Sequence, residues 1–597
     1  MGSGELPAVE RRWLERVVRA TIKIEAVIEV RPDQDSISSS PSVLSNAEIA
    51  DRLASLAQLL SSQKENPYKV KAYQRAASRI RNLSESLDEM VRDQEDLTRF
   101  AGIGEAIASA VREIVTTGTL GKLEKLRAQV TPAVASITSH PRLDPKRVIR
   151  VYKKLGISSV NELRQRLESG EVEKLFGARM AQHIRQGLID VHAMLLYYAD
   201  DLSAAIEAFL LGRCAVKRSE AAGDYRRRVD VIEELVFVVE SDDFPGVVAR
   251  MQRYGGRTPL ISSGKDHALF SLSSGILLRL QLAGKGDWGF HMVACTGSKF
   301  HLKKLTAATG PVRELESGKF KSEAALYRKY GLRYIEPELW EGHDEVARAK
   351  AGTLPVLVSA KDIRGDFHAH SMSSDGANSI EDMADAAQER GYDYIGITDH
   401  SQSLKIARGV SAEDLWAQIR FIDKVNGKLR GFRILKSSEV DILADGSLDY
   451  PGELLKELDY TVCSIHSRFA LTREAQTERI LRAMDNPYFN ILGHATGRLL
   501  LKRPGYEIDI ERVIAHARQN GCFFEMNSSP DRLDLSADNA RSAAAAGVLI
   551  SISTDSHSTG ELDLIRCGID QARRAGLQKA DVLNCRPWEK LQRLFRR

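Results

Sequence analysis

The chain has 597 residues, of which 43% are hydrophobic and 28% are charged. A single hydrophobic core does not grow to this size, so we expect roughly three to five globular domains. No apolar run reaches the roughly 18 residues of a membrane helix, and the amino end lacks a signal-peptide pattern. With six scattered cysteines and no Cys-x-x-Cys pair, these features predict a cytoplasmic protein without membrane contact. The net charge of +4 is nearly balanced and does not by itself indicate a nucleic-acid partner.

The first 130 residues are predicted to be mainly helical. An amphipathic helix at residues 9–30 is followed by a linker at 31–45 that is rich in Ser, Pro and Asp. Helical periodicity begins again at Asn46, and a basic stretch with two tyrosines follows. Because clustered cations suit a phosphate backbone, we expect DNA contacts from Lys69, Lys71 and Arg75.

Gly102 and Gly104 flank an apolar residue directly before a predicted helix. Glycines let a DNA backbone approach closely, and the free N–H groups at a helix start can face a phosphate. Alone, Gly-x-Gly is more often an ordinary turn, but hairpin-like segments follow in order at 140–157 and 173–188. This order favours a helix-hairpin-helix. The later segments have lost the Gly-x-Gly, so weaker DNA contacts are expected there, from Lys146 and Arg147.

Six histidines in the last 236 residues each stand in a short piece that is typical of the end of a β-strand. Apolar, β-branched runs precede most of these pieces, and helix-like stretches such as 379–391 and 509–521 lie between them. This alternation predicts a parallel α/β barrel, in which the active site collects at the carboxyl ends of the strands. The six are His368, His370, His400, His466, His494 and His557.

Three carboxylates, Asp375, Glu439 and Asp555, stand at the same level of the predicted barrel. Imidazole and carboxylate without cysteine suit Zn²⁺, Mn²⁺ or Fe²⁺, and a carboxylate can bridge two ions. Any one of the histidines, taken alone, is as readily an ordinary core or surface residue. His516, in the middle of a predicted helix, is interpreted in that way. Six histidines at successive strand ends, with carboxylates beside them, favour a metal site.

On these segments, residues 362–597 resemble a PHP (polymerase and histidinol phosphatase) domain. The resemblance implies a distorted seven-stranded β/α barrel that hydrolyses phosphoesters with three metal ions. It places one ion on His368, His370, Glu439 and Asp555, a second on Glu439, His466 and His494, and a third on Asp375, His400 and His557. Clustered cations lower the pKa of a bridging water and neutralise the leaving oxygen, so no protein nucleophile is needed.

Two arginines are candidate phosphate contacts of this site. Arg408 and Arg498 lie near predicted strand ends, and a guanidinium pairs with phosphate oxygens through a planar fork. A solvated surface charge is an equally good interpretation of either. The segment with Asn527 and Arg532 also resembles the PHP family and is expected to shape the mouth of the barrel.

The order of all these segments resembles the family X DNA polymerases of bacteria and archaea. In that family a small DNA-binding domain and a helical domain precede a nucleotidyltransferase palm, and a PHP domain follows. The resemblance covers residues 45–597 and includes Thr-Gly-Ser-Lys at 296–299 and the stretch 331–342. It predicts a multidomain α+β and α/β protein with an amino-terminal helix and linker (1–44), a first helix-hairpin-helix domain (45–130), a second one (131–200), a palm with its following subdomain (201–345), a linker (346–361) and a PHP (β/α)7 barrel (362–597).

The palm departs from the family where Mg²⁺ would bind. Family members carry two aspartates on one strand and a third on a later strand; the corresponding positions here are Glu234, Val236 and Arg279. Valine offers no ligand oxygen and arginine repels a cation, so we expect no nucleotidyl transfer and interpret Arg279 as a candidate phosphate contact. Other cations remain in the family motifs, and we expect DNA contacts from Arg226, Arg227 and Lys299.

The sequence therefore predicts a metal-dependent DNA phosphodiesterase, a 3′-5′ exonuclease of DNA repair or end processing. Its polymerase-like domains are expected to bind DNA but to have lost nucleotidyl transfer. Its expected partners are gapped, recessed or single-stranded DNA ends. Its expected cofactors are three divalent ions, Mn²⁺ or Zn²⁺, with Fe²⁺ as a further option. Two alternatives stay open: a small-molecule phosphatase of the histidinol-phosphatase type, and a non-catalytic scaffold for DNA ends. No oligomeric state is predicted.

Overall fold

The computed structural model describes residues 44–62, 67–81, 83–100, 102–128, 150–151, 154–156, 160–177, 180–181, 184, 193–272, 275–310 and 319–596. The predicted helix at 9–30, most of the linker that follows it, and the candidate DNA contacts Lys146 and Arg147 lie outside these ranges. Within them, no helix combines the length and the apolar character of a membrane span.

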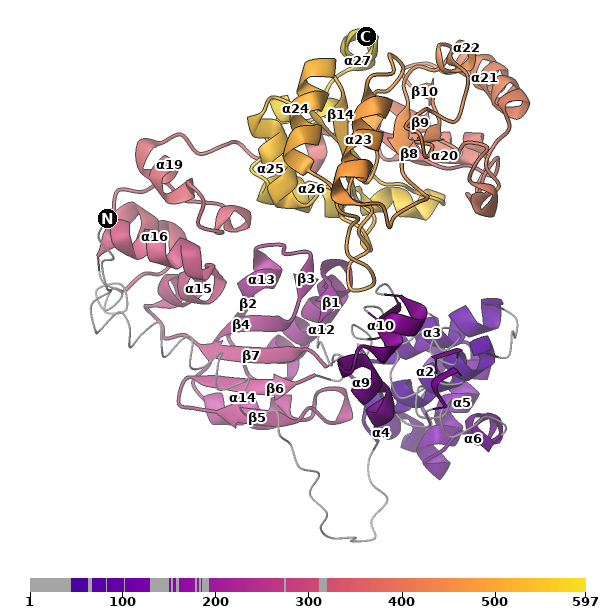
Figure 1. Cartoon of the computed structure of the whole chain (residues 1–597). Helices are drawn as coiled ribbons and strands as arrows, with labels where there is room; N and C mark the ends of the chain where they lie inside the picture. The colour runs from indigo at the N-terminus through magenta and orange to yellow at the C-terminus, as the bar shows by residue number, and fades with distance from the viewer. Residues whose placement is uncertain are drawn as a thin grey trace. The chain divides into compact units, whose positions relative to one another are not determined.

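The first described domain is a cluster of short helices, as predicted (Figure 1). The first of them begins at Asn46, whose side chain accepts a hydrogen bond from Leu87 N at 2.9 Å and donates one to Leu83 O at 3.1 Å. Gly102 has a φ of +86°, which favours glycine, and Gly104 is the N-cap of the helix that follows. The elements are α2 (Asn46–Ser62), α3 (Pro67–Arg81), α4 (Leu87–Arg92), η1 (Leu97–Arg99), α5 (Glu105–Thr117) and α6 (Gly121–Ala128).

Two helices are described in the second predicted helix-hairpin-helix domain, α9 (Val160–Glu168) and α10 (Glu171–Phe176). Gly170, with a φ of +75°, lies between them and allows the chain to reverse. A small apolar core holds this domain together, made of Val151, Leu163, Leu167, Val172, Ala181 and Ile184.

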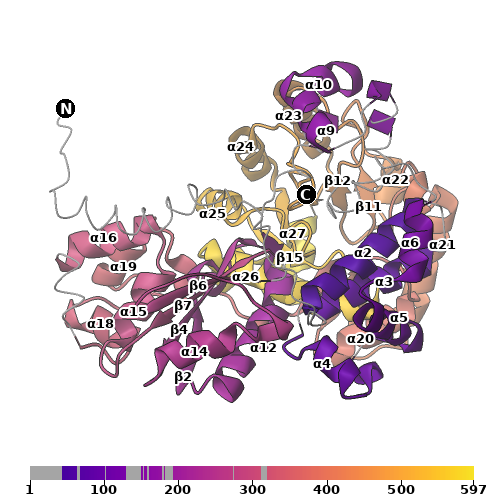
Figure 2. The same cartoon turned by 90° about the horizontal axis from the view of Figure 1, so that it is seen from below.

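The palm is a five-stranded sheet with the strand order β2-β4-β7-β6-β5, in which only the β4–β7 pair is parallel. Alternate residues of β4 face opposite sides: Phe237 packs with α12 and α14, whereas Val236 packs with α15. Figure 2 shows these helices around the strands of the sheet. The elements are β1 (Met194–Leu195), α12 (Leu196–Arg213), β2 (Arg218–Ala222), α13 (Gly223–Arg226), β3 (Val231–Ile232), β4 (Glu234–Glu240), α14 (Phe244–Met251), η2 (Tyr254–Gly256), β5 (Leu260–Ser263), β6 (His267–Ser271) and β7 (Leu277–Leu282).

A helical subdomain follows the palm, and a buried histidine lies at its centre. His301 is fully buried, with Nδ1 2.7 Å from Glu345, Nε2 2.9 Å from the Tyr327 hydroxyl, and its ring stacked on Trp340. Both ring nitrogens are therefore satisfied within the core. The elements are α15 (Trp288–Thr296), α16 (Lys299–Thr309), α18 (Glu323–Lys329), η3 (Pro337–Leu339) and α19 (Glu345–Ala351).

The carboxyl-terminal domain is a parallel α/β barrel, as predicted. Its strands are β8 (Gly365–Ala369), β9 (Tyr394–Ile397), β10 (Arg433–Lys436), β11 (Glu439–Asp441), β12 (Val462–Ser464), β13 (Ile491–Leu492), β14 (Phe523–Asn527) and β15 (Ile550–Ser553). Its helices are η4 (Ala360–Asp362), α20 (Ile380–Glu389), η5 (Lys405–Ala407), α21 (Ala412–Asn426), α22 (Gly452–Leu455), α23 (Arg473–Met484), α24 (Ile510–Asn520), α25 (Ala537–Ala545), η6 (Thr559–Leu564), α26 (Ile565–Arg574), η7 (Lys579–Asp581), η8 (Leu583–Cys585) and α27 (Trp588–Phe595).

The barrel has seven strand positions because β10 and β11 are two halves of one interrupted strand. Two ladders form, β10-β9-β8 and β11-β12-β13-β14-β15, and every strand pair in them is parallel. Parallel bridges connect the ladders, one between His400 and Glu439 and the other between Ala369 and Ser556. The ring of strands is therefore closed, and the carboxyl ends of all its strands meet at one mouth.

The Asn584 side chain joins two strands where the ring closes. Asn584 is fully buried; its Nδ2 donates to Gly365 O at 2.9 Å and to Ile552 O at 2.6 Å, and its Oδ1 accepts from Ile552 N at 3.0 Å. It therefore joins β8 to β15 through three buried hydrogen bonds.

Asn584→Leu is expected to lower the free energy of unfolding of the barrel by about 2–4 kcal/mol, because three backbone groups lose their partner. Chemical denaturation followed by circular dichroism measures this. Asn520→Leu is the control: the hydrogen bond from its side chain to Asp485 is exposed, so a change of about 0.5 kcal/mol or less is expected. Equal effects of the two substitutions would contradict the role given to Asn584.

Candidate metal centre

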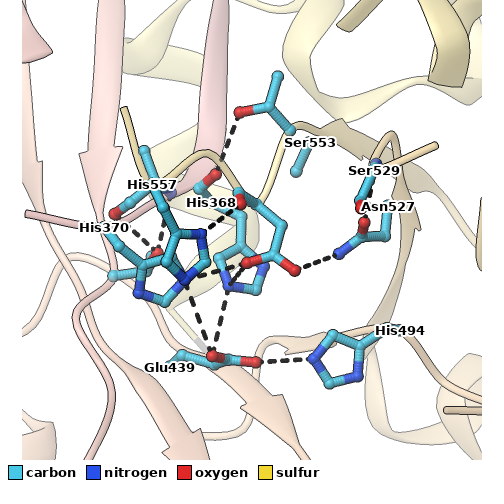
Figure 3. Close-up of polar contacts among 12 residues, drawn as sticks. His368, His370, Glu439, His494, Asn527, Ser529, Ser553 and His557 are labelled. Carbon is cyan, nitrogen blue, oxygen red and sulfur yellow. Dashed lines mark hydrogen bonds and ion pairs between the residues drawn. The ribbon is translucent and has the colours of Figure 1, made fainter. Parts of the chain in front are cut away.

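The predicted histidines and carboxylates converge at the mouth of the barrel. Figure 3 shows His368, His370, Glu439, His494 and His557 close together there. His368 lies inside β8, Glu439 opens β11, and the other histidines follow the ends of their strands within four residues. The interpretation of these pieces as strand ends is confirmed. His368 and His557 are 189 positions apart in the sequence. They belong to one cluster because all the strands run in the same direction and their carboxyl ends meet.

The Glu439 carboxylate lies in the middle of this cluster and is 1% exposed. The imidazole nitrogens nearest to its oxygens are His400 Nδ1 at 2.6 Å, His494 Nε2 at 2.8 Å, His466 Nε2 at 3.3 Å, His368 Nε2 at 3.6 Å and His370 Nε2 at 3.8 Å. A single buried carboxylate therefore faces five imidazoles.

The other two carboxylates lie on either side of His370. Asp555 Oδ1 is 3.1 Å from His370 Nε2 and 3.5 Å from His368 Nε2. Asp375 Oδ1 is 3.3 Å from His557 Nε2 and 3.5 Å from His400 Nε2. The side chains of Asp375 and His557 are about one-third exposed, 33% and 35%, so solvent reaches the cluster from this side.

The donor set fits divalent metal ions. Three groups have ligand atoms within 4.8 Å of one another: His370, Asp375, His400 and His557; His368, His370 and Asp555; and His400, Glu439 and His466. Several buried atoms of the cluster have no hydrogen-bond partner among the described residues, namely His368 Nε2, His370 Nδ1, His400 Nδ1, His494 Nδ1 and Glu439 Oε2. Lone pairs that converge in this way without hydrogen bonds suit cations, and no cysteine is present to change the preference for nitrogen and oxygen ligands.

The grouping partly differs from the one that the PHP resemblance implies. The group of His368, His370 and Asp555 corresponds to the first implied ion. His370 also joins the group of Asp375, and His400 groups with Glu439 and His466. His494 lies outside the three groups and instead contacts Glu439.

Burial disfavours charge in this cluster, yet the carboxylates keep several groups ionised. Burial lowers the pKa of His466, but Glu439 and Asp441 outweigh it and raise this pKa to about 10. Burial would raise the pKa of Glu439, but its imidazole neighbours hold it well below the ordinary value. At His370, burial and the neighbouring His400 lower the pKa to about 4. Glu439 is therefore held as a carboxylate and His370 as a neutral imidazole, the forms that bind a metal.

Two carboxylates that the sequence analysis did not single out orient the imidazoles. Glu525 is fully buried in β14 and its Oε1 lies 2.6 Å from His368 Nδ1, while its Oε2 accepts from His494 N at 2.7 Å. Asp441 Oδ1 lies 2.6 Å from His466 Nδ1. Such partners fix the ring orientation of a metal-binding histidine. Their signals in the sequence are a carboxylate in the apolar strand FFEMN and an acid two residues after Glu439.

The candidate phosphate-binding arginines differ in accessibility. Arg408 is exposed and has a left-handed backbone, with a φ of +55°. Arg498 is half-buried and donates to the carbonyls of Arg532 and Leu533. Part of the hydrogen-bonding capacity of its guanidinium is therefore taken up by backbone carbonyls. Arg532 instead reaches the cluster, with Nε 3.6 Å from Asp555 Oδ2.

The candidate DNA contacts also differ in their accessibility to solvent. Arg75, Gly102, Gly104 and Lys69 are exposed in the first domain, and so is Lys299 after the palm. The side chain of Lys71 is outside the described residues.

Arg226 and Arg227 are instead engaged by carboxylates. Arg226 forms two hydrogen bonds to Glu323, at 2.6 and 2.8 Å. Arg227 is buried and contacts Asp224 and Glu341. Their charges hold the palm to the following subdomain, and this geometry does not favour the predicted DNA contacts.

An ion pair joins Glu234 and Arg279 in the palm. Val236 of β4 pairs in register with Arg279 of β7. Arg279 Nε donates to Glu234 Oε1 at 3.0 Å, and its Nη2 donates to Glu234 Oε2. The guanidinium thus neutralises the carboxylate at this position. Among the described residues, all groups suited to a metal lie in the barrel and none lies in the palm.

Comparison with known protein families agrees with this architecture. Residues 44–120 match the helix-hairpin-helix domain family, and residues 366–529 match the PHP domain family. The second match ends before Asp555 and His557, which the structure adds to the same cluster.

The chain is 32% identical to the DNA polymerase/3′-5′ exonuclease PolX of Bacillus subtilis (strain 168), over 92% of this chain and 99% of that protein. It is also 32% identical to a probable phosphatase of Thermoanaerobacter sp. (strain X514), over 37% of this chain and 89% of that protein. A probable phosphatase of Acetivibrio thermocellus is 32% identical over 33% of this chain and 80% of its own length. Helix-hairpin-helix and PHP domains on either side of a palm define a family X DNA polymerase of the bacterial type. The chain belongs to the PolX family.

Glu525→Gln is expected to weaken the binding of Mn²⁺ about 10- to 100-fold, because the amide cannot serve both His368 Nδ1 and His494 N as an acceptor. Isothermal titration of the metal-depleted protein measures the affinity, and circular dichroism verifies the fold. His516→Gln is the control: this histidine lies on α24 and pairs with Asp485, away from the cluster, as its position in a predicted helix indicated. Unchanged affinity in Glu525→Gln would contradict the orienting role.

Proposed function

We propose that the protein is a metal-dependent DNA phosphodiesterase, a 3′-5′ exonuclease of DNA repair or end processing. The observation that carries this proposal is the convergence of all nine predicted ligands on one cluster at the barrel mouth. The activity in the name of the Bacillus subtilis relative supports it. The helix-hairpin-helix match supports DNA as the partner. The proposed substrates are gapped, recessed or single-stranded DNA ends.

The proposed cofactors are three divalent ions, Mn²⁺ or Zn²⁺, with Fe²⁺ as a further option, held by the nine residues. When bound, such ions supply a hydroxide at neutral pH and neutralise the charge of a leaving oxygen. Glu439 is the residue best placed to serve two ions, because its two oxygens face different imidazoles. His368 and Asp555 belong to the same group, so each is needed for one of the ions.

The remaining residues of the mouth bind and orient the substrate. Asp375 and His557 are the most exposed members of the cluster, so the scissile phosphate enters on their side. Arg532 lies against Asp555, and Arg408 is exposed after β9; both are suited to contact non-bridging phosphate oxygens. Arg498, which is tied to two backbone carbonyls, is better suited to shape the mouth.

A small-molecule phosphatase is the second candidate. The match of two probable phosphatases to the barrel region alone favours it. A higher kcat/KM on sugar or nucleoside monophosphates than on DNA would establish this alternative. A non-catalytic scaffold is less well supported, because the cluster is complete and its ligand atoms lie within reach of one another.

His368→Ala or Asp555→Ala is expected to lower DNA hydrolysis about 100-fold or more, because each removes a ligand from the same group. Degradation of labelled single-stranded, gapped and recessed DNA in Mn²⁺ measures this. DNA binding should change little, since neither substitution removes a residue that is proposed to contact DNA. His516→Ala serves as the control with full activity. Residual hydrolysis near the wild-type rate would place the nuclease site elsewhere.

The wild-type protein is expected to add no nucleotides to a primed template, in either Mg²⁺ or Mn²⁺. The Arg279 guanidinium neutralises Glu234, and Val236 offers no oxygen for a second ligand. Primer extension with all four deoxynucleoside triphosphates, on a primer end protected against hydrolysis, measures this. Template-dependent extension that is lost in Glu234→Ala would show that the palm has retained synthesis.

A further inference from the structure

A cavity of about 380 Å³ opens beside the metal cluster, within the size range of ligand pockets. It adjoins the cluster through the chain itself, because Ser371 follows the ligand His370 and the same loop continues to Asp375. The lining residues are Ser371, Met372, Ser373, Ser379, Ile380, Glu381, Asp414, Ala417, Gln418 and Phe421.

Part of the wall of this cavity is apolar and exposed. Met372 is 61% exposed and Phe421 is 37% exposed, although both are large hydrophobic side chains. Asp414, Ala417 and Phe421 lie on one face of α21, at a helical spacing of three and four residues. An exposed aromatic ring beside a site for phosphodiesters offers a surface on which a base can stack.

Gln418, one of the lining residues, has a buried polar atom without a partner among the described residues. The residue is 6% exposed, and its Nε2 donates to Asp399 Oδ2 at 3.0 Å. Asp399 also accepts from Ser371 N at 2.8 Å, so the orientation of the Gln418 amide is fixed. Its Oε1 is left with no hydrogen-bond partner among the described residues. A buried acceptor of this kind favours a ligand that brings a donor.

The charges of the lining exclude a phosphate from this cavity. Glu381 and Asp414 are its charged residues, and no cation lines it. A phosphate group would be repelled here, whereas the metal cluster next to it attracts one. A neutral, flat group with N–H donors fits the acceptor Oε1, the aromatic wall and the carboxylates together.

We propose that this cavity binds the nucleobase of the nucleotide at the scissile phosphate, with the base stacked on Phe421 and an exocyclic amino group donating to Gln418 Oε1. The inference rests on the proposed DNA phosphodiesterase function. It predicts a preference for terminal adenine or cytosine, which carry an amino group, over thymine. A small aliphatic amine is the competing occupant, because the two carboxylates would also attract a cation.

The first test compares cleavage of a single-stranded oligonucleotide with a 3′-terminal adenine and of the same strand with an abasic end, by the full-length protein in Mn²⁺. Phe421→Ala is expected to raise KM on the adenine-ended strand about ten-fold, with little change in kcat. On the abasic strand, wild type and Phe421→Ala should have the same KM. Trp416→Ala is the matched control, because Trp416 is also 37% exposed on α21 but does not line the cavity.

Gln418→Met tests the acceptor separately. It keeps the length of the side chain, and it is expected to abolish the preference for adenine or cytosine over thymine while leaving the effect of Phe421→Ala in place. Equal KM values of wild type and Phe421→Ala on the adenine-ended strand would overturn the proposal. Competitive inhibition by putrescine, stronger than that by adenosine, would assign the cavity to an amine and also overturn it.

A binding measurement separates failure of this inference from failure of the proposed function. A strand with 2-aminopurine at its 3′ end, mixed with the protein in Ca²⁺, is expected to lose fluorescence on stacking, and Phe421→Ala should not quench it. Quenching without cleavage in Mn²⁺ would contradict the nuclease function and support the base site. Cleavage with the same quenching in wild type and Phe421→Ala would support the nuclease and overturn the base site. Absence of both would overturn both.

Discussion

The buried carboxylate of Glu439 is the interaction on which the barrel mouth depends. A charge that is 1% exposed is tolerated only with partners, and five imidazoles surround this one. These imidazoles come from four strand positions, β8, β9, β12 and β13, so the carboxylate keeps all its partners only if the ring of strands is closed. The bridge between His400 and Glu439, at the point where the two ladders join, connects closure of the ring directly to the site.

The palm holds a partly buried acid in another way. The charge of Glu234 is neutralised by Arg279 from the neighbouring strand. Arg226 and Arg227 are likewise paired with Glu323 and Glu341. Ion pairs within the protein thus hold a sheet that keeps its apolar core on both faces. In the barrel, nitrogen and oxygen lone pairs converge and suit a cation. In the palm, the carboxylates are already neutralised by arginines.

How much could be predicted from the sequence differs between these sites for a physical reason. Strand ends of a parallel barrel must meet, so a histidine such as His466 could be assigned to the mouth from its position after an apolar run alone. Glu525 and Asp441 could not, because their role depends on which imidazole edge they face. Arg226 shows a second limit: its charge predicts a DNA contact, whereas in the structure it pairs with Glu323, a carboxylate 97 positions away in the sequence. Gln418 gave no signal at all, since an unpaired amide oxygen exists only in the packed fold.

The hydrogen bonds of Asp399 have a consequence for regulation. This carboxylate accepts from Ser371 and Gln418, and it stands directly before His400 in the chain. Any ligand that orders the Ser371–Asp375 loop therefore acts on residues that also bind metal. By thermodynamic linkage such an effect is reciprocal. If a bound base raises the affinity for the ions, the ions raise the affinity for the base by the same factor. Substrate and cofactor would then act as allosteric effectors of each other across a few ångströms.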